Sequence, residues 1–322
     1  LYGRRLELLA LDSAQQSPAR LAERIEQEAL ALIAPWWAEA RAGDLATALP
    51  GVPVLGPLGS AAELDGRAEH IYSVTPQYAD QARVLVDEAL GHSRLQPSAR
   101  LTLALISSDE PLHAHAARAA QRQLDLHDSA RLLDWHGSGA DSAQAALAWL
   151  RQQPEVDAVL LLGPPDWAET LLPELVQRNR PPRLLLSANE LGRRPLQWPA
   201  AWRRLLTLAV ATPSADETDP SRLFADLAAV GEPKPSAPAI QALAYSASCL
   251  GVEALRRGGR HVDRESLRAG IEDIDELRTG VTHRLSFAPG RRSGLVGSAV
   301  ASVEGEPASL RIQGHWRLPR TR

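Results

Sequence analysis

The sequence predicts an α/β fold of two doubly wound parallel-sheet lobes joined by a hinge of several crossovers. The chain has 322 residues, of which 44% are hydrophobic, enough for two lobes that each bury a core. Short apolar segments alternate with segments of helical periodicity, which is typical of a parallel sheet with helices on both faces. Two polar segments rich in turn residues, 91–97 and 212–220, interrupt this alternation. We place crossovers between the lobes there.

The first predicted lobe contains residues 1–97 and 214–275. Ser17 followed by Pro18 predicts the start of a helix that runs to about Glu28, because serine caps a helix N-terminus and proline fits its first turn. The other elements expected in this lobe are strands at 6–11, 30–33, 52–55 and 70–74 and helices at 38–49, 77–91, 221–230 and 236–257.

The second predicted lobe contains residues 98–213 and 276–322. Its periodicity predicts helices at 111–124, 140–153 and 166–178 between strands at 101–106, 130–134, 158–162, 183–186 and 205–211. The tail changes character, and short strands are expected near 282–287, 297–303 and 310–316.

Composition excludes several classes of partner. The net charge of −4, without a basic run, argues against nucleic acid. No stretch is long and apolar enough to insert into a membrane, and the N-terminus is not a signal peptide, so an exported protein would have lost its signal.

The single cysteine, Cys249, lies in an apolar helical run, which predicts a buried, inert thiol.

Three segments carry a family resemblance: the strand and loop around Val52-Pro53-Val54, the Thr75-Pro76 helix start, and the turn at 287–294. Together with the strand at 6–11, they resemble the type I periplasmic solute-binding proteins of the branched-chain amino acid class. The resemblance covers almost the whole chain. It implies a periplasmic, monomeric protein without a cofactor that traps a small-molecule solute by hinge closure, most often for an ABC permease. It also implies that a first β-α unit is missing before the 6–11 strand.

In that family, loops after strands hold the ligand. The loop at 34–38 would bind a carboxylate, but where the family usually has Gly-Pro-x-Ser-Ser this chain has Ala34-Pro35-Trp36-Trp37-Ala38, with Trp37 in place of a serine. An aromatic wall for an apolar or aromatic-bearing solute, extended by Leu58 in the next loop, is one interpretation. The alternative is that the two indoles only cover the start of a helix.

Hydroxyl side chains follow the strand at 70–74. The resemblance implies that Ser73 and Thr75 bind the ligand's head group, with Tyr78 beyond them. Thr75 equally fits a helix N-cap, with Pro76 at the first helical position.

Position alone suggests Ser108, Trp167 and Glu190 as ligand contacts of the second lobe. Asp109 and Asp166 fit helix caps better.

Catalytic and metal motifs have no support. His113 and His115 are two residues apart on a predicted helix, so their side chains diverge. The segment 135–139 lacks the spacing of a nucleophile elbow. We therefore expect a binding protein. A sensing or accessory protein of a periplasmic oxidation system is the alternative, and an enzyme on a doubly wound scaffold ranks below both.

Overall fold

The chain forms two compact units. Unit 1 contains residues 1–76 and 215–295, and unit 2 contains residues 77–214 and 296–322. The computed structural model describes residues 3, 5–12, 15–36, 49–58, 69–93, 100–127, 130–211 and 238–321.

Unit 1 is built on a small parallel sheet with the strand order β1-β2-β3, which comprises β1 (Leu32–Ile33), β2 (Val54–Leu55) and β3 (Ile71–Tyr72). Helix α1 (Pro18–Glu28) begins as predicted, since Ser17 accepts a hydrogen bond from the amide of Arg20. Leu21 and Ile25 of α1 pack with Val54 and Ile71 in one buried cluster. One face of the sheet is thereby covered.

The opposite face of this sheet meets α11 (Pro238–Arg257), and α12 (Arg264–Glu272) packs against α11. Gly251 of α11 lies close to the side chains of Ile33 and Leu55, because a Cβ atom there would be 3.3 Å from each. Helix α12 begins with a capping box, in which Asp263 and Ser266 bond each other's backbone amides.

The predicted strand at 6–11 is not formed. Residues 5–12 lie outside any strand or helix, and Leu6 and Leu8 are 53% and 84% exposed. A strand is stable only when its backbone groups pair with a neighbour, and among the described residues β1 pairs with β2 alone. Among the described residues, this apolar segment therefore has no partner strand with which to pair.

Unit 2 contains a seven-stranded sheet with the order β10-β9-β8-β7-β6-β4-β5. Its first five strands in the chain are parallel, and the last two are antiparallel to their neighbours. The strands are β4 (Leu101–Ser108), β5 (Ala130–Gly137), β6 (Ala158–Leu162), β7 (Arg183–Ser187), β8 (Leu206–Val210), β9 (Ala299–Glu304) and β10 (Ser309–Ile312).

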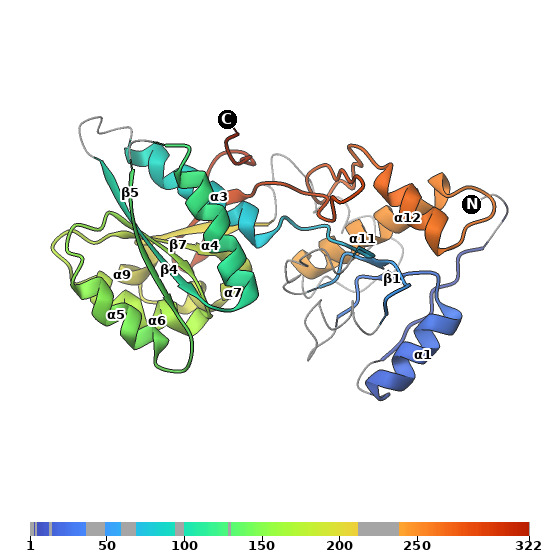
Figure 1. Cartoon of the computed structure of the whole chain (residues 1–322), viewed down its shortest axis with the longest axis horizontal. Coiled ribbons are helices and arrows are strands. Elements are labelled where there is room, and N and C mark those ends of the chain that lie inside the picture. The colour runs from blue at the N-terminus through green and yellow to red at the C-terminus, as the bar shows by residue number, and fades with distance from the viewer. Residues whose placement is uncertain are drawn as a thin grey trace. The chain divides into compact units, whose positions relative to one another are not determined.

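Helices cover both faces of this sheet (Figure 1), as the sequence predicts. Leu103 and Leu105 of β4 join the cluster under α3 (Tyr78–Ser93) and α4 (Pro111–Leu124). Ala104 and Ile106 join the cluster under α5 (Ser142–Arg151) and α6 (Pro165–Leu175). Three short helices were not predicted: α7 (Ala188–Leu191), α8 (Arg194–Gln197) and α9 (Ala200–Arg203).

The compact units divide the chain differently from the predicted lobes. Helix α3 belongs to unit 2, because Leu85, Val86 and Leu90 are buried against β4, β6 and α4. Residues 276–295 belong to unit 1. The crossover predicted at 212–220 and the helices predicted at 38–49 and 221–230 lie wholly or almost wholly outside the described residues, and most of the crossover predicted at 91–97 does too.

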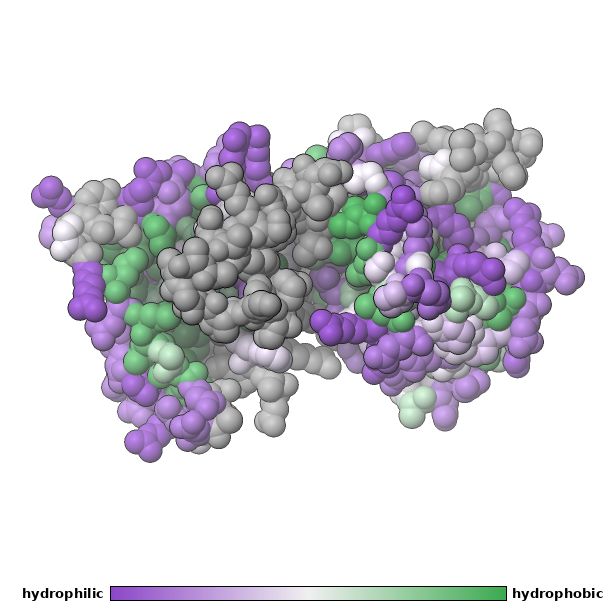
Figure 2. Space-filling model, turned by 180° about the vertical axis from the view of Figure 1, so that it is seen from behind, coloured by the Kyte–Doolittle hydropathy of each residue, from purple (hydrophilic) through white to green (hydrophobic). Residues whose placement is uncertain are grey.

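The face seen in Figure 2 is mainly hydrophilic, with smaller apolar areas between charged side chains. Leu8, Trp36 and Leu318 are the most exposed large apolar side chains among the described residues. None of the described helices combines the length and the apolar character that a membrane crossing requires.

Candidate functional site

The first candidate wall lies at the carboxyl edge of the small sheet in unit 1. The loops after β1 and β2 continue side by side, because Trp36 and Leu58 form a parallel bridge and the Leu58 amide donates to the Pro35 carbonyl at 3.0 Å. Trp36 is 68% exposed and Leu58 is partly buried. An indole beside a leucine therefore gives this edge an accessible apolar surface. Trp37 lies outside the described residues.

The loop after β3 is held by its own hydroxyl groups. Ser73 Oγ lies 2.9 Å from Thr75 Oγ1 and accepts a hydrogen bond from the Thr75 amide at 3.2 Å. Ser73 is buried and Thr75 is more exposed. Ser73 thus shapes the loop, and Thr75 is its more accessible hydroxyl. Thr75 is not a helix cap, because α3 begins only at Tyr78.

Ser293 is a part of this wall that sequence reasoning missed. The backbone around it pairs with Ser73, whose amide donates to the Arg292 carbonyl at 2.8 Å and whose carbonyl accepts from the Gly294 amide at 2.9 Å. The Ser293 hydroxyl also reaches the Thr75 carbonyl at 2.8 Å. The turn that contains it resembles a family turn, but its sequence does not indicate that it extends the sheet beyond β3.

The interior of unit 1 contains a polar cluster around Tyr72. The guanidinium of Arg292 lies over the Tyr72 ring, 4.9 Å from its centroid, and donates to the Tyr72 hydroxyl at 3.0 Å. Both groups also bond Glu272 of α12. Burial raises the pKa of Tyr72, and its hydroxyl stays protonated. The cluster joins β3 to α12 and to the 292–294 segment.

His70 is buried beside this cluster, and its burial should make the stability of unit 1 depend on pH. Burial, then the charges of Arg268 and Arg292, lower the pKa of His70 below 6.5, while Glu69, Glu272 and Tyr72 complete its ionisable surroundings. As the pH falls through 6.5, His70 becomes protonated in the unfolded chain but stays neutral in the folded chain. The free energy of unfolding of unit 1 therefore decreases until the pH reaches the lowered pKa of the folded state. We expect urea midpoints from pH 8 to 5 to fall more steeply in the wild type than in His70→Gln. Equal slopes would contradict this expectation.

A second candidate wall lies at the carboxyl end of β4 in unit 2. Ser108 Oγ is 2.5 Å from Nδ1 of His113, a buried residue in the first turn of α4. The ring of Tyr78 meets the His113 ring edge-on, with the centroids 5.8 Å apart. His113 therefore connects two predicted site residues, although its spacing from His115 only indicated that it was unsuited to zinc.

Trp167 and Glu190 lie after neighbouring strands of the same sheet but in different surroundings. Trp167 is buried in the core under α5 and α6, with its ring 5.8 Å from that of Trp135. Glu190 is partly exposed on α7, directly after β7. The structure thus places Trp167 in the core and leaves Glu190 accessible.

The expected caps Asp109 and Asp166 are wrong. The N-cap of α4 is Glu110, and that of α6 is Pro164, neither with a side-chain cap bond. Asp166 lies instead inside the first turn of α6, where its charge suits the helix dipole, and it pairs with Arg194.

A serine, a histidine and an aspartate are joined where β4 meets β5, but without an accessible nucleophile. Ser107 Oγ lies 2.5 Å from His136 Nδ1, and His136 Nε2 lies 2.9 Å from Asp134 Oδ2. Ser107 is fully buried, so its hydroxyl cannot reach a substrate and serves to hold the two strands together.

The described residues contain no group of three or more His, Cys, Asp or Glu side chains placed to hold a metal ion. Cys249 is only half-buried on α11 rather than enclosed, and burial raises the pKa of its thiol. A raised pKa keeps the thiol protonated and unreactive.

Comparison with known proteins gives one family and several similar folds. A family model described as periplasmic binding protein matches residues 1–306. No curated protein matches the sequence. A solute binding protein of an ABC transporter from Rhodopseudomonas palustris BisB5, in complex with 3,4-dihydroxy benzoic acid, is 15% identical with a TM-score of 0.67, over 99% of this chain and 88% of that chain.

Two other solved structures are similar. A branched chain amino acid ABC transporter protein from Thermus thermophilus with bound valine is 15% identical with a TM-score of 0.64, over 93% of this chain and 81% of that one. A fatty acid ABC transporter substrate-binding protein from Thermomonospora curvata is 15% identical with a TM-score of 0.68, over 97% of this chain and 82% of that one. At these identities the likeness shows the fold alone.

Proposed function

Because this chain belongs to the periplasmic binding protein family, which it matches over residues 1–306, we propose that it traps a small apolar or aromatic-bearing solute. Membership confirms the predicted fold class, the type I two-lobed α/β architecture. It also confirms that the chain is a solute-binding protein and not an enzyme. The nature of the solute, and what receives it, are the proposal.

The accessible indole of Trp36 beside Leu58 carries this proposal. These side chains occupy the carboxyl edge of a parallel sheet, where ligands of open α/β folds bind. An exposed tryptophan offers a large apolar face with one N–H donor, which suits a ring or an alkyl chain better than a sugar. Three of the similar structures are a protein with bound valine, a fatty acid ABC transporter substrate-binding protein and a protein in complex with 3,4-dihydroxy benzoic acid. Each of these three kinds of solute combines an apolar body with a carboxylate.

Polar recognition would come from Ser73 and Thr75 of unit 1 and from Tyr78, Ser108 and Glu190 of unit 2. A carboxylate leaving water needs hydrogen-bond donors, which hydroxyl groups and loop amides supply. Hinge closure upon the solute would let both units contribute. Trp37 stays in the proposed apolar wall, and Trp167 would support the second wall from beneath.

We place the protein in the periplasm as a monomer that delivers its solute to an ABC permease. This follows the usual role of the family. Sensing without transport is the alternative, and the departure from the family's loop sequence at Trp36-Trp37 favours it. Loss of solute uptake on deletion of the gene would support transport, whereas unchanged uptake would support sensing.

The test is a thermal-shift screen with valine, leucine, benzoate, 3,4-dihydroxybenzoate, octanoate and glucose. A solute at 100 times its Kd should stabilise the protein by about 2.7 kcal/mol. We expect a shift with a solute that has a ring or an alkyl chain. Trp36→Ala should weaken its binding at least tenfold, and Leu8→Ala, which removes another exposed apolar side chain of unit 1, should not. Binding of glucose alone, or equal binding by Trp36→Ala, would refute the proposed solute class.

A further inference from the structure

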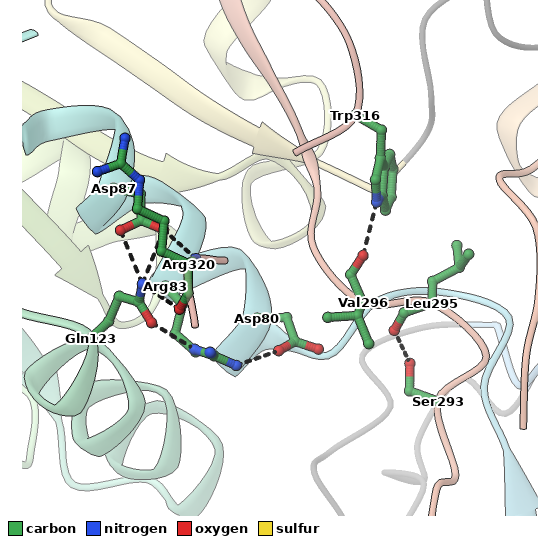
Figure 3. A network of polar contacts seen from close by, with 9 residues as sticks. All are labelled: Asp80, Arg83, Asp87, Gln123, Ser293, Leu295, Val296, Trp316 and Arg320. Atoms are coloured by element: carbon green, nitrogen blue, oxygen red, sulfur yellow. Dashed lines mark hydrogen bonds and ion pairs between the residues drawn. The ribbon is translucent and has the colours of Figure 1, made fainter. Parts of the chain in front are cut away.

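The carboxyl-terminal segment of unit 2, residues 316–320, contacts two distant parts of that unit (Figure 3). We refer to this segment as the C-terminal clasp. One partner is α3, which starts just after the chain passes from Pro76 of unit 1 to Gln77 of unit 2. The other is the segment that starts at Val296, where the chain passes into unit 2 again. The clasp therefore binds the segment directly after one crossing and the second half of the helix that follows the other.

At the second crossing the clasp binds the backbone. The Trp316 indole Nε1 donates to the Val296 carbonyl at 2.8 Å, as Figure 3 shows. Ser298 and Arg317 exchange two backbone hydrogen bonds, at 3.0 and 2.9 Å. Gly297, which precedes Ser298, lies close to the clasp backbone, because a Cβ atom there would be 2.0 Å from the Arg317 carbonyl oxygen. The first three residues after the crossing are thus held directly against the clasp.

At the first crossing the clasp binds α3 through two consecutive acids. Asp87 accepts a hydrogen bond from the Arg320 amide at 2.8 Å. Gln123 of α4 donates both to Asp87, at 2.9 Å, and to the Arg320 carbonyl, at 3.1 Å. The neighbouring acid, Glu88, is buried and forms an ion pair with Arg317. Because Glu88 is buried and Arg317 only partly exposed, salt screens this pair less than it screens a surface pair.

Unit 1 ties the same two crossings together on its own side. The Ser293 hydroxyl is shared between the carbonyl of Thr75, at 2.8 Å, and the carbonyl of Leu295, at 2.7 Å. Hydrogen bonds therefore hold each crossing segment up to its last residues on both sides. The third crossing, at residues 214–215, lies outside the described residues.

We propose that the C-terminal clasp fastens the segments that follow both of these crossings to the body of unit 2, and thereby confines the bending of these two crossings to the links Pro76–Gln77 and Leu295–Val296. Hinges are a few residues that absorb backbone rotation between rigid bodies, and the clasp supplies the rigidity on one side. The statement that solute binding uses this bending rests on the proposed function. The attachment of the two segments to unit 2 by the clasp does not depend on it.

The experiment uses Trp316→Phe and Asp87→Ala in the full chain, with Asp80→Ala as the matched control. Asp80 lies two turns earlier on α3, and its carboxylate accepts a hydrogen bond from Arg83 at 3.4 Å. Hydrogen exchange should become at least tenfold faster at the amides of Ser298, Arg317 and Arg320 in the two clasp variants, and should be unchanged there in the control.

Bending is measured by electron spin resonance between nitroxides at Glu23→Cys of unit 1 and Glu155→Cys of unit 2, both exposed, in a Cys249→Ser background. The clasp variants should broaden the distance distribution, and Asp80→Ala should not. Unchanged exchange would overturn the fastening. Faster exchange with an unchanged distribution would overturn the confinement of bending. Neither readout needs a solute, so a failed solute screen leaves both conclusions intact.

Discussion

Alanine at position 56 is expected to lower the free energy of unfolding of unit 1 by about 2–5 kcal/mol. Gly56 follows β2 with φ of +57°, a conformation that L side chains rarely adopt. An added Cβ would lie 2.5 Å from the Ala247 Cβ on α11 and 3.1 Å from a methyl group of Val74. Helix α11 and the loop after β2 would have to move apart, which would disturb the sheet edge that carries Trp36 and Leu58.

Two further variants separate the causes. Gly259→Ala places alanine at φ of +80° where no atom lies within 4 Å, so it isolates backbone strain, worth about 1–2 kcal/mol. Adding Ala247→Gly to Gly56→Ala removes the closer of the two contacts and should recover part of the remaining loss, since glycine inside α11 itself costs about 1 kcal/mol. The measurement is urea unfolding followed by circular dichroism. If Gly56→Ala costs no more than Gly259→Ala, the close approach of α11 to this loop is incorrect.

Trp167→Ala should destabilise unit 2 by about 3–5 kcal/mol, the usual cost of removing a buried tryptophan. Its side chain is 7% exposed in the cluster under α5 and α6, and its ring packs edge-on against Trp135. Alanine would leave a cavity that these rigid helices cannot fill. Urea unfolding of the purified variant provides the measurement.

Trp167→Phe decides between a core role and direct solute contact. Phenylalanine keeps an apolar ring, so a core residue should lose less stability than in Trp167→Ala and leave solute affinity within about threefold. Trp149→Phe, a partly buried tryptophan packed on the same core, is the control. A large loss of affinity in Trp167→Phe at nearly wild-type stability would make Trp167 a ligand contact instead.

The elements that sequence predicts well are those with strong local signals. The continuous apolar run of β4 and the Ser17-Pro18 start of α1 both appear where expected, since buried strands and capped helices are specified by neighbouring residues. The strand at 6–11 fails for the opposite reason: a short apolar run favours a strand but does not indicate whether a partner strand is present.

The candidate site was less predictable, because its side chains depend on contacts between distant segments. Ser73 was chosen for its position after a strand, yet its loop is completed by Ser293, 220 positions further along the chain. His113 was judged only by its distance from His115, and nothing local indicated that it would face Ser108. Even the assignment of α3 to a unit depends on tertiary packing rather than on its own periodicity.

The antiparallel strand β9 has a consequence for how the chain folds. Ala301 pairs with Leu208, so the large sheet joins residues separated by the whole second segment of unit 1, residues 215–295. Contacts this distant in sequence cost loop-closure entropy and slow folding. The sheet therefore stays unfinished during synthesis until residues 299–304 have been made, and its β8 edge remains open to chaperones or to aggregation during that time.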